Sequence, residues 1–212
     1  MDDDANTLQQ RGWMVTHQLE ARGIRDARVI EAMRRIPRHA FVAAAMRREA
    51  YDDTPLPIEE GQTISQPYIV ALICQALRLR GDERVLDVGT GSGYQAAVLA
   101  ELAAEVVSIE RIPELSELAA ENLAAAGLAE RVELRVGNGW DGVPDRAPFD
   151  GIAVAAAAPE LPPALVEQLS PEGRLVIPLG RSVDQWLVSV ERSGRIRTLA
   201  AARFVPLVDY PR

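Results

Sequence analysis

The stretch VLDVGTGSGY, residues 85–94, decides the fold class of this 212-residue chain. Its apolar start predicts a short buried strand over residues 84–88. Three glycines, Gly89, Gly91 and Gly93, follow before a helical pattern resumes. Glycines between a strand and a helix let the main chain turn sharply and come close to a ligand. We therefore expect a ligand-binding turn at the carboxyl end of this strand, where open α/β sheets hold their ligands.

Strands and helices alternate through the rest of the chain. This alternation predicts right-handed crossovers and a doubly wound, mostly parallel α/β sheet with helices on both faces. A turn at Ser193-Gly194 joins the last two strands, and we expect this hairpin to add an antiparallel strand at one edge. Further strands are expected over residues 105–109, 132–136, 151–155, 174–178, 186–190 and 197–205, and helices over 67–79, 93–102, 113–126 and 162–169.

The N-terminal region has a different pattern. Apolar residues recur at helical spacing over residues 7–48, where Gly23 and Pro37 divide the region into about three short helices. Residues 49–66 are expected to form a long connection, and a connection of that length inside a compact domain is usually functional. We expect a single domain over residues 1–212, with N-terminal helices and a ligand loop in 1–66 and the α/β core in 67–212.

Composition narrows the functional class. Hydrophobic residues make up 48% of the chain, which is enough for one sizeable core. The net charge is −8 and no Lys/Arg cluster stands out, which argues against a nucleic-acid partner. We expect no signal peptide, because three Asp residues follow Met1, and no membrane span, because no apolar run is long enough. The single cysteine, Cys74, lies in an apolar helical stretch, which favours a buried residue. Since one cysteine cannot form an internal disulfide, a reducing compartment fits, and we expect a cytoplasmic protein.

Two acidic residues indicate which ligand the glycine turn holds. The glycines follow a G-x-G-x-G spacing, whereas a dinucleotide site usually has G-x-G-x-x-G. Asp87 would repel a phosphate but could attract the ammonium of S-adenosylmethionine. Glu110 ends the second strand, where a carboxylate can accept both hydroxyls of a ribose. The alternatives are that Asp87 caps the turn and that Glu110 is an exposed charge at a strand end.

A third loop, GNGW at residues 137–140, follows the strand expected over 132–136. In enzymes that use S-adenosylmethionine, the side chain at this place commonly contacts the adenine amino group. The amide oxygen of Asn138 could accept such a bond. Asn138 and Gly139 could equally form an ordinary Asn-Gly turn, and the residues alone leave both interpretations open.

Several longer motifs are more specific than the glycine turn, above all TISQP at residues 63–67. Together they resemble the protein-L-isoaspartate O-methyltransferases, and the resemblance is collinear from about residue 36 to residue 207. The motifs that carry it are IPRHAFV (36–42), LPIEEGQTISQP (56–67), DVGTGSGYQAAV (87–98), SIER (108–111), APFD (147–150), GRLVIP (173–178) and RFVPL (203–207).

The resemblance implies a seven-stranded, Rossmann-like methyltransferase sheet with an N-terminal helical extension. It also implies transfer of a methyl group from S-adenosylmethionine to the free α-carboxylate of L-isoaspartyl residues in damaged proteins, which leaves S-adenosylhomocysteine. The methyl ester would then close to a succinimide, which begins repair. The residues implied for the cofactor are Thr63, Ile64, Asp87, Gly89, Thr90, Gly91, Ser92, Gly93, Glu110, Arg111, Asn138 and Gly139.

The expected chemistry needs no general base, since a carboxylate with a pKa of about 4 is already ionised at neutral pH. His17 and His39, the only histidines, lie in the N-terminal helical region. By resemblance, Ser65 lies beside the reacting groups, where its hydroxyl could donate to the acceptor carboxylate and orient it. The alternative is that Ser65 only caps the helix beginning near Pro67.

The substrate peptide is expected to bind to Ser65 and to the segment Val205, Pro206, Leu207 and Val208 through main-chain hydrogen bonds. The alternative for that segment is an ordinary edge strand. Two positions depart from the family pattern: Asn138 stands where an Asp is usual, and Ala155 stands where a Thr is common.

Three other functions remain open. The chain could methylate an aspartate of one dedicated peptide or a small acid, or it could bind S-adenosylmethionine without catalysis. A nicotinamide oxidoreductase is opposed by the loop spacing and by Asp87. As partners we expect isoaspartyl-containing proteins, with neither nucleic acid nor membrane, and we expect the protein to be a monomer without a bound metal.

Overall fold

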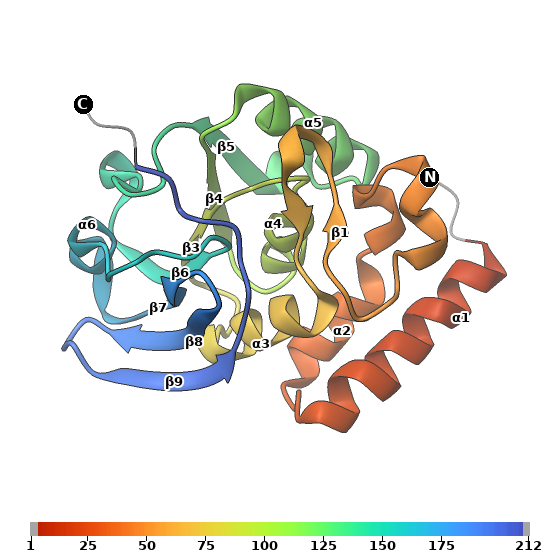
Figure 1. Ribbon diagram of the computed structural model, residues 1–212, viewed down its shortest axis with the longest axis horizontal. Helices are drawn as coiled ribbons and strands as arrows, with labels where there is room; N and C mark the ends of the chain where they lie inside the picture. The colour runs from red at the N-terminus through yellow and green to blue at the C-terminus, as the bar shows by residue number, and fades with distance from the viewer. Residues whose placement is uncertain (1–3, 210–212) are drawn as a thin grey trace.

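A seven-stranded sheet forms the centre of the computed structural model, which describes residues 4–209 (Figure 1). Its strand order is β5-β4-β3-β6-β7-β8-β9, and neighbouring strands from β5 to β7 pair in parallel. The mostly parallel α/β class predicted from the sequence is therefore confirmed. The strands are β3 (Arg84–Val88), β4 (Glu105–Glu110), β5 (Val132–Val136), β6 (Phe149–Val154), β7 (Leu169–Arg181), β8 (Asp184–Glu191) and β9 (Ile196–Ala201).

The hairpin of β8 and β9 extends one edge of the sheet with an antiparallel strand, as predicted. β8 pairs antiparallel with both β7 and β9, so the reversed strand lies one position inside the edge and β9 is the edge strand. The strand expected over residues 197–205 ends at Ala201. The chain leaves the sheet because the Gln185 side chain accepts a hydrogen bond from the Phe204 N–H (2.7 Å) and donates one to the Phe204 carbonyl (3.2 Å).

The strand order places a switch point beside β3. The chain passes from β3 to β4 on one side, and β6 pairs with β3 on the other. Connections that leave in opposite directions open a crevice at the carboxyl ends of the two central strands. The glycine turn after β3 and Ala155 after β6 meet there, and the Ala155 N–H donates to the Val88 carbonyl at 2.8 Å.

Both faces of the sheet are covered, as predicted. Side chains alternate along β3, so Val85 packs into one apolar cluster while Leu86 and Val88 pack into another. The cluster around Val85 contains residues of five helices: α1 (Ala5–Met14), α2 (Ala27–Arg35), α3 (Pro67–Leu77), α4 (Tyr94–Ala100) and α5 (Pro113–Ala125). The other cluster is covered by the short helix α6 (Pro163–Glu167) and by loop residues such as Trp140.

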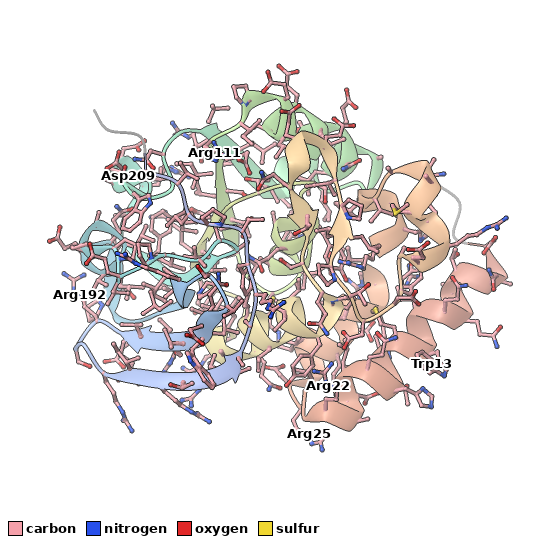
Figure 2. All side chains as sticks on the ribbon, viewed as in Figure 1. Trp13, Arg22, Arg25, Arg111, Arg192 and Asp209 are labelled. Atoms are coloured by element: carbon pink, nitrogen blue, oxygen red, sulfur yellow. The ribbon has the colours of Figure 1, made fainter. Side chains whose placement is uncertain are left out.

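The N-terminal region is helical, as expected, but more broken than three helices. Helix α1 (Ala5–Met14) runs into a π-helical turn and then a 3₁₀ turn, which Gly23 ends with a φ of 97°. After α2, further 3₁₀ turns follow Pro37. This region lies at the opposite end of the molecule from the hairpin of β8 and β9 (Figure 1). Trp13, 55% exposed, lies on α1 at the outer edge of the molecule (Figure 2).

The connection over residues 49–66 is not structureless. Strands β1 (Leu56–Pro57) and β2 (Thr63–Ile64) form a small antiparallel hairpin, closed by a hydrogen bond from the Ile58 N–H to the Gln62 carbonyl (2.9 Å). Helix α3 then begins at Pro67, as predicted, because proline fits the first helical position. In the part of the chain that the structure describes, none of the helices is both long and apolar enough to cross a membrane.

Candidate active site

A cavity lies over the glycine turn. The segments that line it include the β1–β2 hairpin, the turn after β3, the end of β4 and the C-terminal segment 205–208. Figure 1 shows the hairpin and the C-terminal segment crossing the same side of the sheet. Of the residues predicted from the sequence, the cavity is lined by Thr63, Ile64, Ser65, Gly89, Thr90, Gly91, Ser92, Glu110, Arg111, Gly139, Val205, Pro206, Leu207 and Val208, but not by Asp87, Gly93 or Asn138.

The third glycine of the turn serves packing rather than the cavity. Gly89, Gly91 and Gly93 all have positive φ angles, a conformation that other residues adopt only with strain. A Cβ at Gly93 would lie 3.3 Å from the Cβ of Ala119 in α5. Gly93 therefore lets α4 and α5 approach each other, while the first two glycines form the floor of the cavity.

Glu110 lies where the sequence placed it, at the carboxyl end of β4, but it is 6% exposed and not the solvent-exposed charge of the alternative interpretation. One carboxylate oxygen accepts the Gly91 N–H (3.0 Å). The other accepts the N–H groups of Arg111 (2.8 Å) and Ile112 (3.1 Å). Glu110 thus holds the glycine turn against the end of β4 while lining the cavity.

Asp87 lies behind the cavity lining, and its expected contact with the ligand stays a prediction. Alternation along β3 turns its side chain toward α4, where it is fully buried. Its two oxygens accept hydrogen bonds from Gln95 Nε2 and Ser108 Oγ, both at 2.7 Å. Burial raises the pKa of Asp87 to about 6, although these two hydrogen bonds act in the opposite direction. Ser108 Oγ in turn lies 2.6 Å from Thr90 Oγ1, on the cavity lining.

Gln95 is a site residue that the sequence interpretation missed. Because its Nε2 donates to Asp87, its amide oxygen is left buried without a hydrogen-bond partner among the described residues. The Ser92 hydroxyl is unpartnered in the same way, and both residues line the cavity. Buried polar atoms without partners are costly, so the pair indicates a polar ligand. The signal in the sequence was the place of Gln95 in the first turn of the helix after the glycines.

Asn138 forms the Asn-Gly turn that was one of its two interpretations. Its amide oxygen accepts the Trp140 N–H (3.1 Å), and its amide nitrogen donates to Asp209 (3.1 Å) and Asp141 (3.3 Å). The oxygen proposed for adenine thus already accepts one of its two possible hydrogen bonds, and Asn138 does not line the cavity, so its contact with adenine stays a prediction. Figure 2 shows Asp209 and Arg111 on the same side of the molecule.

Gly139, next to Asn138, does line the cavity. A Cβ at this position would lie 2.7 Å from Val88 Cγ1 and 3.1 Å from Leu207 Cδ1. The missing side chain therefore lets the third loop, the end of β3 and the C-terminal segment meet at one point.

Ser65 lies at the junction of two cavities. The second cavity, on the side of Phe204 and Val183, shares Thr63, Ser65 and Ala155 with the first, as well as Val205. Ser65 does not cap α3. Instead, the Tyr68 N–H in the first turn of α3 donates to Asp53 Oδ1 (3.2 Å), and the Ser65 hydroxyl makes no hydrogen bond to any described residue.

The C-terminal segment is not an ordinary edge strand. The Ala157 N–H donates to the Val205 carbonyl, and the Leu207 N–H donates to the Ala157 carbonyl, both at 2.8 Å. Trp140 Nε1 donates to the Leu207 carbonyl at 3.1 Å. Since successive residues of an extended segment direct their main-chain groups to opposite sides, the Pro206 carbonyl faces away from Ala157. That carbonyl is available to bind a peptide.

The histidines and the cysteine lie away from both cavities. His17 is exposed and stacks on Trp13, while His39 is buried against the Tyr51 hydroxyl (2.7 Å). Cys74 is 1% exposed, which confirms the prediction of a buried residue, and burial raises the pKa of its thiol. Within residues 4–209, no cluster of three or more His, Cys, Asp or Glu side chains is placed to hold a metal.

The family model described as protein-L-isoaspartate(D-aspartate) O-methyltransferase (PCMT) matches residues 10–211, nearly the whole chain and every segment around the first cavity. The chain belongs to this family. Among curated members, the protein-L-isoaspartate O-methyltransferase of Methanoculleus marisnigri is 55% identical over 202 residues, which cover 94% of this chain and 91% of the relative. Protein-L-isoaspartate O-methyltransferase 1 of Rhodopseudomonas palustris is 52% identical over 212 residues, 98% of this chain and 86% of the relative.

Solved structures of the family have the same fold. One protein-L-isoaspartate O-methyltransferase is 28% identical with a TM-score of 0.84, and the match covers 94% of this chain and 66% of that chain. A family protein from Plasmodium falciparum, solved in complex with S-adenosyl-L-homocysteine, is 27% identical with a TM-score of 0.79. The second match covers 92% of this chain and 96% of the other. The sequence resemblance is thereby confirmed at the level of the family.

Proposed function

We propose that this chain transfers the methyl group of S-adenosylmethionine to the free α-carboxylate of L-isoaspartyl residues in damaged proteins. The neighbouring main-chain nitrogen then attacks the ester, methanol leaves, and the succinimide that forms begins the repair of the damaged protein. The observation that carries the proposal is the place of Ser65, which lines both the cavity over the glycine turn and a second cavity and whose hydroxyl has no partner among the described residues. Membership of the family supports it.

The lining of the first cavity suits the proposed cofactor. S-adenosylmethionine, when bound, supplies a methyl group on a positively charged sulfur. Glu110, at the end of β4, offers a carboxylate for ribose hydroxyls. The unpartnered Gln95 oxygen, with the Asp87 carboxylate behind it, offers a negative environment for an ammonium. Thr63 and Ile64 line the part of the cavity nearest Ser65, where we place the methionine end.

The second cavity is the proposed place of the acceptor peptide. Apolar side chains of Ile69, Val183 and Phe204 line it, and the Pro206 carbonyl offers a main-chain acceptor nearby. The acceptor carboxylate is ionised at neutral pH, so Ser65 needs only to donate a hydrogen bond and hold one oxygen in line with the methyl group. Recognition through main-chain groups suits damage that arises in many sequence contexts.

Other expectations stay predictions that accompany this proposal. They are a single functional domain with the division at residue 66, a monomeric state, a cytoplasmic location, no nucleic-acid or membrane partner, and cofactor contacts by the individual residues named above.

The proposal is tested with radiolabelled S-adenosylmethionine and a pair of peptides that differ only in an isoaspartyl or aspartyl linkage. We expect base-labile label on the isoaspartyl peptide alone, since a methyl ester hydrolyses in base. Equal labelling of both peptides would indicate a different carboxyl acceptor. Binding of S-adenosylhomocysteine without labelling of either peptide would make the chain a binding protein and contradict the proposal.

The affinity for S-adenosylhomocysteine is expected to weaken as the pH falls below 7. Burial raises the pKa of Asp87 to about 6, so its carboxyl takes up a proton near that pH in the free protein. A nearby ammonium stabilises the ionised carboxylate and lowers this pKa, so binding releases a proton and is favoured at higher pH. From this linkage we expect the dissociation constant to rise about fourfold between about pH 7.5 and pH 5.5.

Isothermal titration calorimetry across that pH range measures the effect, and Asp87→Asn is the matched control. The amide cannot titrate, so its affinity should be lower and independent of pH. A wild-type protein whose affinity is equally flat would show that Asp87 does not sense the ligand.

A further inference from the structure

Arg38 is the largest side chain in the fully buried core, and its hydrogen bonds lead to the active site. Its Nε donates to the Ala50 carbonyl (2.7 Å), Nη1 to the Ser65 carbonyl (2.8 Å) and Nη2 to the Thr54 carbonyl (3.4 Å). The guanidinium also lies 5.1 Å from the centre of the Tyr94 ring. A single side chain from the N-terminal region therefore reaches the main chain of Ser65.

The contacts of Arg38 are unusual for a buried charge. It makes no ion pair with a carboxylate of the described residues, and its hydrogen-bond acceptors are neutral main-chain carbonyls. Burial lowers the pKa of Arg38 to about 10, which still leaves the guanidinium charged at neutral pH. A buried charge is costly, and packing alone would be served by an apolar side chain. The planar guanidinium, with several N–H donors, is suited instead to hold several main-chain carbonyls in one arrangement.

Asp53 holds the other side of the same turn. Its carboxylate accepts Gln66 Nε2 (2.7 Å) and the Tyr68 N–H (3.2 Å), the two residues that flank Pro67. Arg38 thus fixes the main chain at Ser65, and Asp53 fixes the start of α3 immediately after it. Ser65 is 27 residues from Arg38 in the chain, and its own hydroxyl remains free of other described residues.

We propose that Arg38 is a positioning residue for methyl transfer: by holding the Ser65 carbonyl it fixes the direction of the Ser65 hydroxyl toward the acceptor carboxylate. The proposal rests on the function proposed above, in which Ser65 orients the acceptor. Arg38 does not line either cavity, so it acts through Ser65 and touches neither substrate. Without the guanidinium hydrogen bonds, the main chain at Ser65 is free to move. A misplacement of about 1 Å in a reacting group can lower the rate about 100-fold.

A double-mutant cycle between Arg38 and Ser65 tests this. The kcat, the KM for an isoaspartyl peptide and the S-adenosylhomocysteine affinity are measured for Arg38→Met, Ser65→Ala and the double variant, under single-turnover conditions where rates are low. We expect Arg38→Met to lower kcat about 10- to 100-fold, with cofactor affinity within about threefold of wild type. In the Ser65→Ala background, Arg38→Met should cost less than about threefold, because the group that it positions is absent.

Two further variants separate positioning from stability. Arg38→Lys keeps the charge but lacks the planar guanidinium, so its kcat should lie between those of Arg38→Met and wild type. The same double-mutant cycle is measured with Arg38→Lys, which replaces Arg38→Met if the methionine variant does not fold. Arg28→Met is the matched control: Arg28 also joins two elements by donating to carbonyls, those of Leu79 (2.9 Å) and Leu102 (2.8 Å), away from the cavities. It should lower the melting temperature and leave kcat unchanged.

The outcomes are distinct. An equal loss of kcat from Arg38→Met in both backgrounds, or no loss in the wild type, would overturn the positioning role while the proposed function stands. A loss of kcat in Arg28→Met as large as that in Arg38→Met would also overturn the positioning role. If wild type does not label the isoaspartyl peptide, the proposed function itself fails; if it does and Ser65→Ala keeps full activity, the roles of both residues fail.

Discussion

Replacing Ser65 with alanine lowers kcat for an isoaspartyl peptide about 10- to 100-fold, since a hydrogen bond to a charged group contributes roughly 1.5–3 kcal/mol. The loss falls on kcat because the Ser65 hydroxyl, free of described partners, is proposed to meet the acceptor carboxylate as the methyl group moves. S-adenosylhomocysteine affinity should change little, since the first cavity keeps its glycine turn and Glu110. Methyl transfer kinetics with the labelled cofactor give the first quantity, and calorimetry gives the second.

Two other variants give this result its meaning. Ser65→Thr keeps a hydroxyl at the same place and should retain more activity than alanine. Ser193→Ala removes an exposed hydroxyl from the turn between β8 and β9 and should leave every constant unchanged. If Ser65→Ala turns over as fast as wild type, the hydroxyl does not orient the acceptor.

Replacing Glu110 with alanine is expected to weaken S-adenosylhomocysteine binding about 100-fold, through loss of a charge-assisted contact and of the ordered turn. The carboxylate accepts the N–H groups of Gly91, Arg111 and Ile112, all near the cavity, so its removal also frees the main chain there. At saturating cofactor, kcat should fall much less than the affinity. Calorimetry and the dependence of rate on cofactor concentration measure the two effects.

Glu105→Ala is the matched control, because Glu105 begins the strand that Glu110 ends, and its exposed carboxylate pairs with Arg84 at 2.6 Å. Glu110→Gln tests the charge separately, since an amide keeps one acceptor of similar shape. Unaltered affinity in Glu110→Ala would show that the cofactor does not bind at the end of β4.

The sequence was most informative where local pattern and geometry agree. Residues 84–88 and 132–136 form strands with the predicted bounds, and α3 begins at Pro67 as expected, because proline and glycine constrain the backbone directly. The family motif at residues 63–67 led to Ser65, which the structure places between the two cavities. Local composition was sufficient for the strands and for the helix, whereas Ser65 was found through the family resemblance.

Contacts between distant segments were not predictable in the same way. The orientation of Asp87 toward Gln95 depends on which side of β3 faces α4, which the glycine motif does not state. Strand β9 ends early because of the Gln185 side chain, 19 residues from its partner Phe204. The reach of Arg38 to Ser65 depends equally on tertiary packing, since an isolated arginine in a helical region usually indicates a solvated surface.

Two of the segments that line the first cavity lie about 140 residues apart in the chain, the end of β2 at Ser65 and the C-terminal segment at Val205. A ligand that fills it touches both and so acts as a non-covalent tie between the early and the late part of the chain. Neither segment belongs to the seven-stranded sheet. A ligand that leaves the cavity therefore gives up its contacts with both segments, while the paired strands of the sheet keep their own hydrogen bonds.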